Sequence, residues 1–187
     1  MKFTLHFRGA LFANGSPHHK HDLRRVFHHQ LRMLWQRQAL RDIAEVIYVS
    51  SDPSAPHGSL IRPAMGFRFA PLVAASLHAV AEIKIMLMRP EAPGNLITQG
   101  GDVDNRLKTL FDALTMPRHA NQLPPGVNPT PEEEPFFCLL EDDNLITSLQ
   151  VRTEHLLEPG VSPNHVDLFI DVRTCITRPT MGNLALA

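Results

Sequence analysis

Cysteine, long apolar runs and net charge are scarce in this sequence of 187 residues. Its two cysteines, Cys138 and Cys175, lie far apart and outside any CxxC pair, so neither a disulfide framework nor a structural zinc site is indicated. No apolar run reaches the roughly 18 residues of a membrane span. His6 and Arg8 interrupt the apolar N-terminus before a signal-peptide core could form, so we expect a cytoplasmic protein that is not secreted.

The overall composition is that of an ordinary globular protein, with 43% hydrophobic and 20% charged residues, which argues against wholesale disorder. The length suits one domain with a real core and is short for two domains. Walker A, GxGxxG and GxSxG motifs are absent from the sequence. Nucleotide hydrolysis and serine chemistry therefore have no support.

A net charge of −1 conceals a basic N-terminal part. Through residue 41 the chain has eight Lys or Arg residues against one Asp, and the remainder has ten against eighteen acidic residues. A helical apolar pattern runs from Asp22, which would cap it, to about residue 44. The basic residues that form a candidate DNA-binding surface there are Lys20, Arg24, Arg25 and Arg32. A solvated helix face explains them equally well, and the pI of about 6.8 does not indicate a strongly basic DNA coat.

Apolar periodicity predicts an α+β fold in a single domain. The expected strands cover residues 2–8, 80–88, 146–156 and 165–173, with 66–73 as an edge strand or hairpin arm and a second helix from about residue 103. The resulting order, β-α-β-α-β-β, predicts a mixed or antiparallel sheet with two main helices. We expect the domain to span residues 1–178, with a proline-rich surface insertion at 117–135 and a flexible tail at 179–187.

The stretch GGDVDNRLKTLFDALT, residues 100–115, opens with two glycines and two acids and continues as an amphipathic helix. Its apolar stripe consists of Leu107, Leu110, Phe111 and Leu114. Asp104 and Lys108 share one border of that stripe, because residues four apart stand above each other on a helix. The alternative interpretation is structural: Asp102 would be an N-cap, and Asp104 and Lys108 would form an ordinary ion pair.

A second acidic cluster, Glu141-Asp142-Asp143, lies in a turn just before a strand. A solvated turn is the alternative interpretation, because Asp and Asn are the commonest turn residues. Combined with the acids at the helix start, the cluster predicts an open, oxygen-rich site of the kind that Mg²⁺ or Mn²⁺ prefers. Such an ion generates a hydroxide nucleophile and polarises a phosphodiester, while a nearby lysine offsets the charge on phosphorus. The chemistry indicated is that of a nuclease.

The segments GDVDNRLKTLFDALT and LEDDNLITSLQV together resemble the RusA-type Holliday junction resolvases, whose pattern is D-x-D-N-x-x-K-x-x-x-D-A-L and later D-D before a strand. By residue, the resemblance implies that Asp102, Asp104 and Asp143 bind the metal and that Lys108 is the catalytic lysine. We expect Asp142 to be a further ligand or a supporting acid. The resemblance also implies a RusA-like homodimer that cuts branched DNA by paired nicks with Mg²⁺ or Mn²⁺, and hence a nucleoid-associated role in DNA recombination and repair.

Two departures from the family pattern leave other functions open. The spacer between the helix and the acidic turn, residues 116–140, is much longer than the family's connection, and its proline-rich part is a candidate docking site for a protein partner. The chain is also less basic than a stand-alone junction binder. The alternatives are a non-catalytic DNA-binding or assembly subunit with the same fold, and a nuclease of the same chemistry that acts on RNA or flapped DNA.

Overall fold

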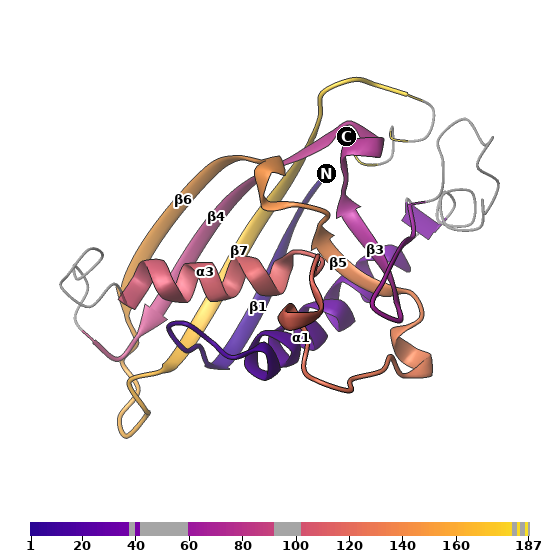
Figure 1. Cartoon of the computed structure of the whole chain (residues 1–187). Helices are drawn as coiled ribbons and strands as arrows, with labels where there is room; N and C mark the ends of the chain where they lie inside the picture. Colours follow the sequence, from indigo (N-terminus) through magenta and orange to yellow (C-terminus); the bar gives the residue numbers. More distant parts are fainter. Residues whose placement is uncertain (38–39, 42–59, 92–101, 181–182, 184–185, 187) are drawn as a thin grey trace.

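Two β-sheets and two main helices make up the computed structural model, which describes residues 1–37, 40–41, 60–91, 102–180, 183 and 186 (Figure 1). The larger sheet has the strand order β1 (Lys2–Ala10), β7 (His165–Ile176), β4 (Ala79–Arg89) and β6 (Ile146–His155). Strands β1 and β4 are antiparallel to β7, whereas β6 is parallel to β4. The α+β class with a mixed sheet and two main helices is therefore as predicted.

The smaller sheet has the order β2 (Arg62–Ala64), β3 (Phe67–Val73) and β5 (Phe136–Leu140). Strands β2 and β3 form a hairpin around Met65 and Gly66, whose positive φ angles of 50° and 81° suit a tight two-residue turn. Strand β5 is parallel to β3 and buried throughout, which explains why its sequence is continuously apolar. Strand β3 is the hairpin arm expected at residues 66–73, and β2 and β5 are additions to the expected succession.

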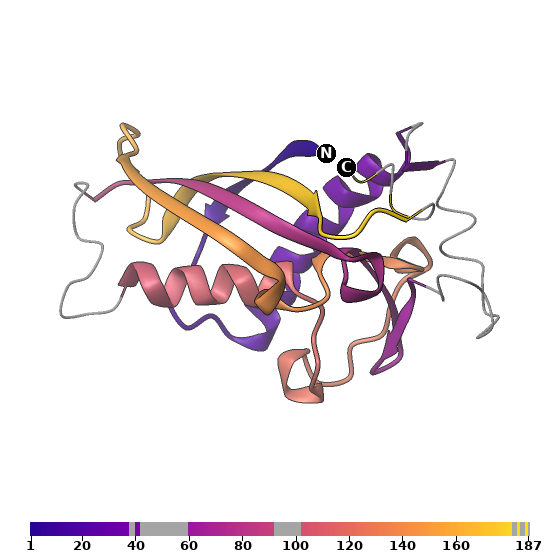
Figure 2. The same cartoon turned by 90° about the horizontal axis from the view of Figure 1, so that it is seen from above.

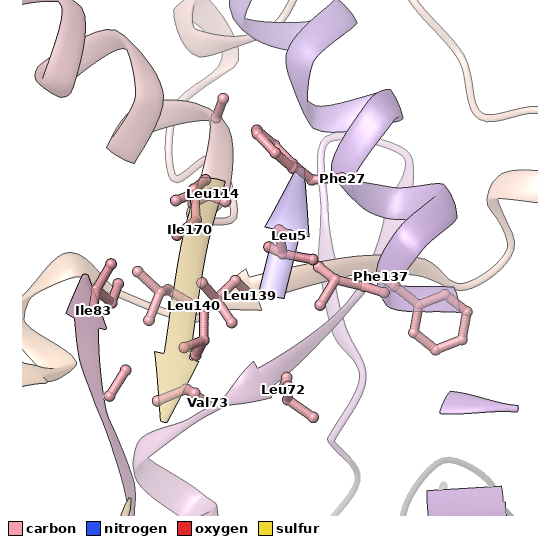
Figure 3. Packing of buried hydrophobic residues seen from close by; sticks show 14 of the residues in the cluster. Leu5, Phe27, Leu72, Val73, Ile83, Leu114, Phe137, Leu139, Leu140 and Ile170 are labelled. Atoms are coloured by element: carbon pink, nitrogen blue, oxygen red, sulfur yellow. The ribbon is translucent and has the colours of Figure 1, made fainter. Parts of the chain in front are cut away.

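Helices α1 (Pro17–Trp35) and α3 (Asp102–Leu114) cover one face of the larger sheet, and the other face is left open (Figure 2). Alternating strand residues meet the apolar stripes of the helices, so that Leu5, Ile83 and Ile170 share one core with Phe27 and Leu114 (Figure 3). Leu139 and Leu140 of β5 belong to the same cluster and join the two sheets.

Helix α1 begins and ends earlier than predicted. Ser16 is its N-cap, with its hydroxyl oxygen accepting from the backbone N–H of His19, and Pro17 occupies the first turn. Asp22 therefore lies inside the helix. The helix stops at Trp35, where the continuous apolar pattern had suggested an extension to about residue 44, a position outside the described residues.

In two segments that were expected to be irregular, the structure shows buried contacts. Residues 117–135 do lack long elements and contain only the short turns η2 (Ala120–Gln122) and η3 (Pro131–Glu133), but Leu123 and Glu133 are buried against the rest of the chain. In the expected tail, Asn183 is buried and donates to the Leu77 carbonyl at 2.8 Å, and Leu186 is part of the core. Among the described residues, each segment thus contributes a buried apolar side chain, Leu123 in the first and Leu186 in the second.

Among the described helices, none is long and apolar enough to cross a membrane.

Candidate functional site

The acidic turn after β5 is held by contacts within the chain. Glu141 accepts from the Arg62 side chain at 2.7 Å and from the backbone N–H of Ala75 at 2.9 Å. Asp142 caps the turn η4 (Asp143–Leu145) by accepting from the backbone N–H of Asn144 at 2.9 Å. The side chain of Asp143, by contrast, is exposed and has no hydrogen bond or ion pair in the part of the chain that the structure describes. It is therefore the carboxylate of this turn that is open to a ligand.

The acidic turn and the end of α3 lie side by side because the chain after α3 joins the edge of β5. Thr115 forms a parallel bridge with Leu140, and the backbone N–H of Met116 donates to the Leu140 carbonyl at 2.9 Å. A cavity of about 160 Å³ lies at this junction, and the residues that line it are Asp112, Thr115, Met116, Arg118, Gln122, Asp142 and Asp143. Three carboxylates and one guanidinium thus face one small space.

Basic side chains offset two of these three carboxylates. The Lys20 ammonium lies 2.7 Å from a carboxylate oxygen of Asp112, and Arg118 forms an ion pair with Asp142. Arg118 is exposed, and a second cavity of about 320 Å³ on the same turn is lined by it together with Glu141, Asp142 and Asn144. An anion such as a phosphate can approach Arg118 from solvent, while Asp143 offers its charge to a cation.

The N-terminal half of α3 carries the other predicted site residues. Asp104 and Lys108 are exposed, and no ion pair joins them among the described contacts, so the ordinary ion pair of the alternative, structural interpretation is not formed. The backbone of Asp102 begins the helix, and its side chain is outside the description. Asp104 and Lys108 therefore present free charges on the surface of the helix.

Buried contacts fix the position of α3 on the sheet. Arg106 is buried and donates to the Leu11 carbonyl and, at 3.0 Å, to the Asn164 side chain. The backbone N–H of Gly15 donates to the Thr109 hydroxyl at 2.9 Å, and a Cβ on Gly15 would lie only 2.7 Å from the Thr109 methyl group. The loop before α1 therefore clamps the middle of α3, so its two ends cannot shift independently.

The two acidic clusters lie at opposite ends of α3 (Figure 1). Asp104 precedes Asp112 by eight residues, which corresponds to about 12 Å of helix rise, and it is Asp112 that shares the cavity with Asp143. Among the residues that the structure describes, no three His, Cys, Asp or Glu side chains gather closely enough to hold a metal ion. The structure thus brings Asp142 and Asp143 to Asp112 and leaves Asp104 apart.

One arginine of α1, Arg24, points into the molecule. Arg24 is buried, and its guanidinium donates to the Gln122 carbonyl at 3.0 Å and to the Asp112 carbonyl at 2.7 Å. Burial lowers the pKa of Arg24 to about 10, and the group is still charged at neutral pH. A phosphate contact by Arg24, as expected from the sequence, is incompatible with this position. Helical spacing could not reveal it, because α1 packs on residues 117–135 as well as on the sheet.

The remaining basic residues of α1 also bind partners within the chain. Arg25 forms an ion pair with Glu133 at 2.6 Å, and Arg32 donates to the Glu132 carbonyl at 3.3 Å. Lys20 is bound to Asp112 at the cavity. In this structure the candidate DNA-binding residues of α1 serve to hold residues 117–135 and the end of α3. Sequence reasoning gave Arg118 no role, since it lies in the proline-rich stretch and belongs to no recognisable motif.

Comparison with known proteins identifies no relative: no family model, curated protein or solved structure matches this chain.

Proposed function

We propose that this protein is a metal-dependent endonuclease that hydrolyses phosphodiester bonds in branched DNA. The observation that carries the proposal is the exposed carboxylate of Asp143, which lies in one cavity with Asp112 and Arg118 at the end of the helix that bears the DxDNxxK motif. A free carboxylate supplies the hard oxygen that Mg²⁺ or Mn²⁺ prefers, and a guanidinium pairs with a phosphate.

The proposed ligands belong to two copies of the chain. Carboxylate oxygens bind Mg²⁺ at about 2.1 Å, so two aspartates that share an ion must lie much closer than the helix rise of about 12 Å between Asp104 and Asp112, the residue of α3 that shares a cavity with the acidic turn. The clamped middle of α3 prevents the helix from closing that gap. We therefore assign Asp102 and Asp104 of one copy, with Asp143 and Asp142 of the other, to each ion site. When bound, the ion supplies the hydroxide nucleophile and polarises the phosphodiester.

Within this assignment the chain's own cations bind and orient the DNA. Lys108 projects from α3 one turn beyond Asp104, where an ammonium offsets charge that develops on the phosphoryl group. Arg118 approaches a phosphate from the acidic turn, once its pairing with Asp142 is exchanged for one with the DNA backbone. Both contacts are electrostatic and hold the scissile bond between the two acidic clusters.

A second function is favoured by one specific observation. Asp112 and Asp142 are each neutralised by a cation of the same chain. Such an arrangement suits a cluster that only stabilises the fold as well as it suits a metal-binding site. The corresponding protein is a non-catalytic subunit that binds DNA or assembles with a partner. Its cavity residues would then stabilise the fold and would have no effect on any reaction.

The experiment that separates these functions is a cleavage assay on four-way junction, flap, duplex and single-stranded DNA and on RNA, with and without Mg²⁺ or Mn²⁺. The endonuclease proposal expects metal-dependent nicking of branched DNA by the wild type and none by Asp143→Asn. Asp22→Asn, an exposed substitution on α1, is the matched control and should cleave like the wild type. Absence of cleavage of every substrate by the wild type would establish the non-catalytic alternative, and preferred cleavage of RNA would change the substrate class.

A further inference from the structure

The two edge strands of the larger sheet, β1 and β6, differ in whether their outer backbone groups are covered. At the β1 edge, the Gln30 side chain of α1 accepts from the backbone N–H of His6 at 2.9 Å and donates to the His6 carbonyl at 2.7 Å. One side chain thereby satisfies both backbone groups that point outward at the middle of the strand. Such a cover prevents another strand from pairing there. The β1 edge is therefore closed to association.

The β6 edge carries no such cover in the described part of the chain. Strand β6 is ten residues long, pairs with β4 on one side only, and has no hydrogen bond on its outer side among the described residues. Its sequence, ITSLQVRTEH, contains no proline, and its charged residues, Arg152 and Glu154, form an ion pair with each other at 2.5 Å near the end of the strand. Leu149, at the middle of the strand, is 47% exposed. An uncovered edge of this length is a template for a further strand.

We propose that β6 pairs antiparallel with β6 of a second copy of this chain, with the two-fold axis passing through Gln150. Register with β4 places Ser148, Gln150 and Arg152 on the open face, beside Glu82, Lys84 and Met86, and Leu149 and Val151 on the helix face, beside Ile83 and Ile85. Residues directly opposite each other in an antiparallel pair lie on the same face. A two-fold axis through one residue keeps the faces of the two sheets continuous, whereas an axis between two residues inverts them.

The strand is self-complementary in this register. Leu149 lies opposite Val151 of the second copy, and the same pair recurs across the axis, so that the exposed leucine of each copy becomes covered. An axis through Arg152 would instead place two arginines opposite each other. An isologous two-fold contact requires self-complementarity of this kind. The strand that pairs with the β6 edge is therefore β6 of a second copy.

The interface joins two four-stranded sheets into one continuous sheet, with the helices of both copies on the same side. Because the two β6 strands run antiparallel, the start of β6, which follows the acidic turn, lies toward the end of β6 of the second copy, where Glu154 pairs with Met88 of β4. The acidic turn of one copy therefore faces the β4 end of the other copy, which agrees with the ion sites that two copies share in the proposed function. Pairing of the two copies depends on β6 alone, however, and is expected whether or not the protein has nuclease activity.

The test uses two opposite charges at Gln150, which is exposed, so that substitution leaves the fold of each copy unchanged. In the proposed register Gln150→Arg places two arginines opposite each other, and Gln150→Glu places two glutamates opposite each other. Each variant alone should weaken the dimer by roughly fivefold, the effect of about 1 kcal/mol of cross-strand repulsion. An equimolar mixture should recover wild-type association through heterodimers. Gln36→Arg, which adds the same charge at the exposed end of α1, is the control.

Sedimentation equilibrium over a concentration series, without DNA or metal, provides the dissociation constants, and native mass spectrometry identifies the heterodimer. A monomeric wild type would overturn the proposal, as would single variants that associate like Gln36→Arg or a mixture without recovery. Stronger association of Gln150→Glu would also overturn the register, because it would place Arg152 of the second copy opposite that position. Because no cleavage is measured, failure of this proposal and failure of the nuclease proposal are distinguishable.

Discussion

The guanidinium of Arg24 lies 2.7 Å from the backbone carbonyl of Asp112, and this contact joins helix α1 to the end of helix α3. A cation at a helix C-terminus is favoured by the helix dipole, and here it also binds the Gln122 carbonyl. Gln122 in turn accepts from the backbone N–H of Arg118 at 2.6 Å. The buried side chain of Arg24 thus holds the backbone of Asp112 and Gln122, two residues that line the cavity of the candidate site.

Replacing Arg24 with methionine should lower the free energy of unfolding by about 3 kcal/mol, because two buried carbonyls lose charge-assisted hydrogen bonds. Urea denaturation of both proteins measures the difference. Arg32→Met is the control: Arg32 is partly exposed and donates to one carbonyl at 3.3 Å, so the change should be within about 1 kcal/mol. Equal losses in the two variants would contradict a structural role specific to Arg24.

Residues 117–135 should not tolerate replacement by a short Gly/Ser linker. The replacement removes the Gln122 carbonyl that Arg24 binds, the Glu133 carboxylate that Arg25 binds, and the buried side chain of Leu123. We expect the free energy of unfolding to fall by about 3 kcal/mol or more. Thermal unfolding of the linker variant tests this, with Asn128→Gly, an exposed substitution within the segment, as the control. A stable linker variant would show that the segment is only a connector.

Acidification should destabilise the fold through buried histidines of α1. Burial, reinforced by Arg25 and Arg24 and opposed by Glu133 and Asp22, lowers the pKa of His21 to about 4. The unfolded chain therefore binds a proton below about pH 6.5 that the folded chain excludes until about pH 4. Stability is fully present above that window and decreases as the pH falls through it.

The predicted loss from His21 across this window is about 3 kcal/mol. His28, whose pKa burial also lowers, adds to the same trend. Urea unfolding at a series of pH values measures the slope, which should be shallower for His21→Leu, since the leucine stays among Phe67 and Phe136 and does not titrate. His18→Leu, at an exposed position, should retain the wild-type slope. An unchanged slope in His21→Leu would exclude this residue as the cause.

The regular elements were predictable where their period was unambiguous. Strand β4 alternates buried and exposed residues along its length, and α3 follows a clear helical stripe, so both were placed within a residue or two of their bounds. Strand β5 is buried on both faces, and continuous apolar sequence does not distinguish a strand from other buried segments. The early end of α1 was missed because apolar residues continue beyond Trp35.

The direction of polar side chains was not predictable from spacing. Arg24 and Arg32 occupy similar positions in the sequence pattern, but only the packing of residues 117–135 on α1 decides that the first is buried and the second is not. The same holds for the acids. The motif places Asp104 on α3 and Asp143 in a turn, whereas the distance between them depends on α3 running against the direction of β4 and β6.

Lys108→Ala should slow metal-dependent nicking by roughly 10² to 10³, the usual effect of losing one preorganised electrostatic contact. Its exposed side chain has no partner in the described part of the chain, so stability should stay within about 0.5 kcal/mol of the wild type. Single-turnover cleavage of a four-way junction measures the rate, and urea unfolding provides the control. Unchanged rates would reduce Lys108 to a surface charge.

The separation of Asp104 from the acidic turn leads to the sharpest prediction for the proposed function. Asp104→Asn and Asp143→Asn should each abolish nicking when assayed alone, because every ion site then contains one altered ligand. If each site takes Asp104 from one copy and Asp143 from the other, a heterodimer of the two variants has one site with both changes and one intact site. Mixing the variants and allowing subunits to exchange should therefore restore roughly a quarter of the wild-type nicking, as random pairing in a two-fold dimer requires. A site built within a single chain would remain inactive in every combination of the two variants. That result would refute the assignment of each ion site to two copies, but it would not contradict a metal-dependent nuclease whose site lies within one chain.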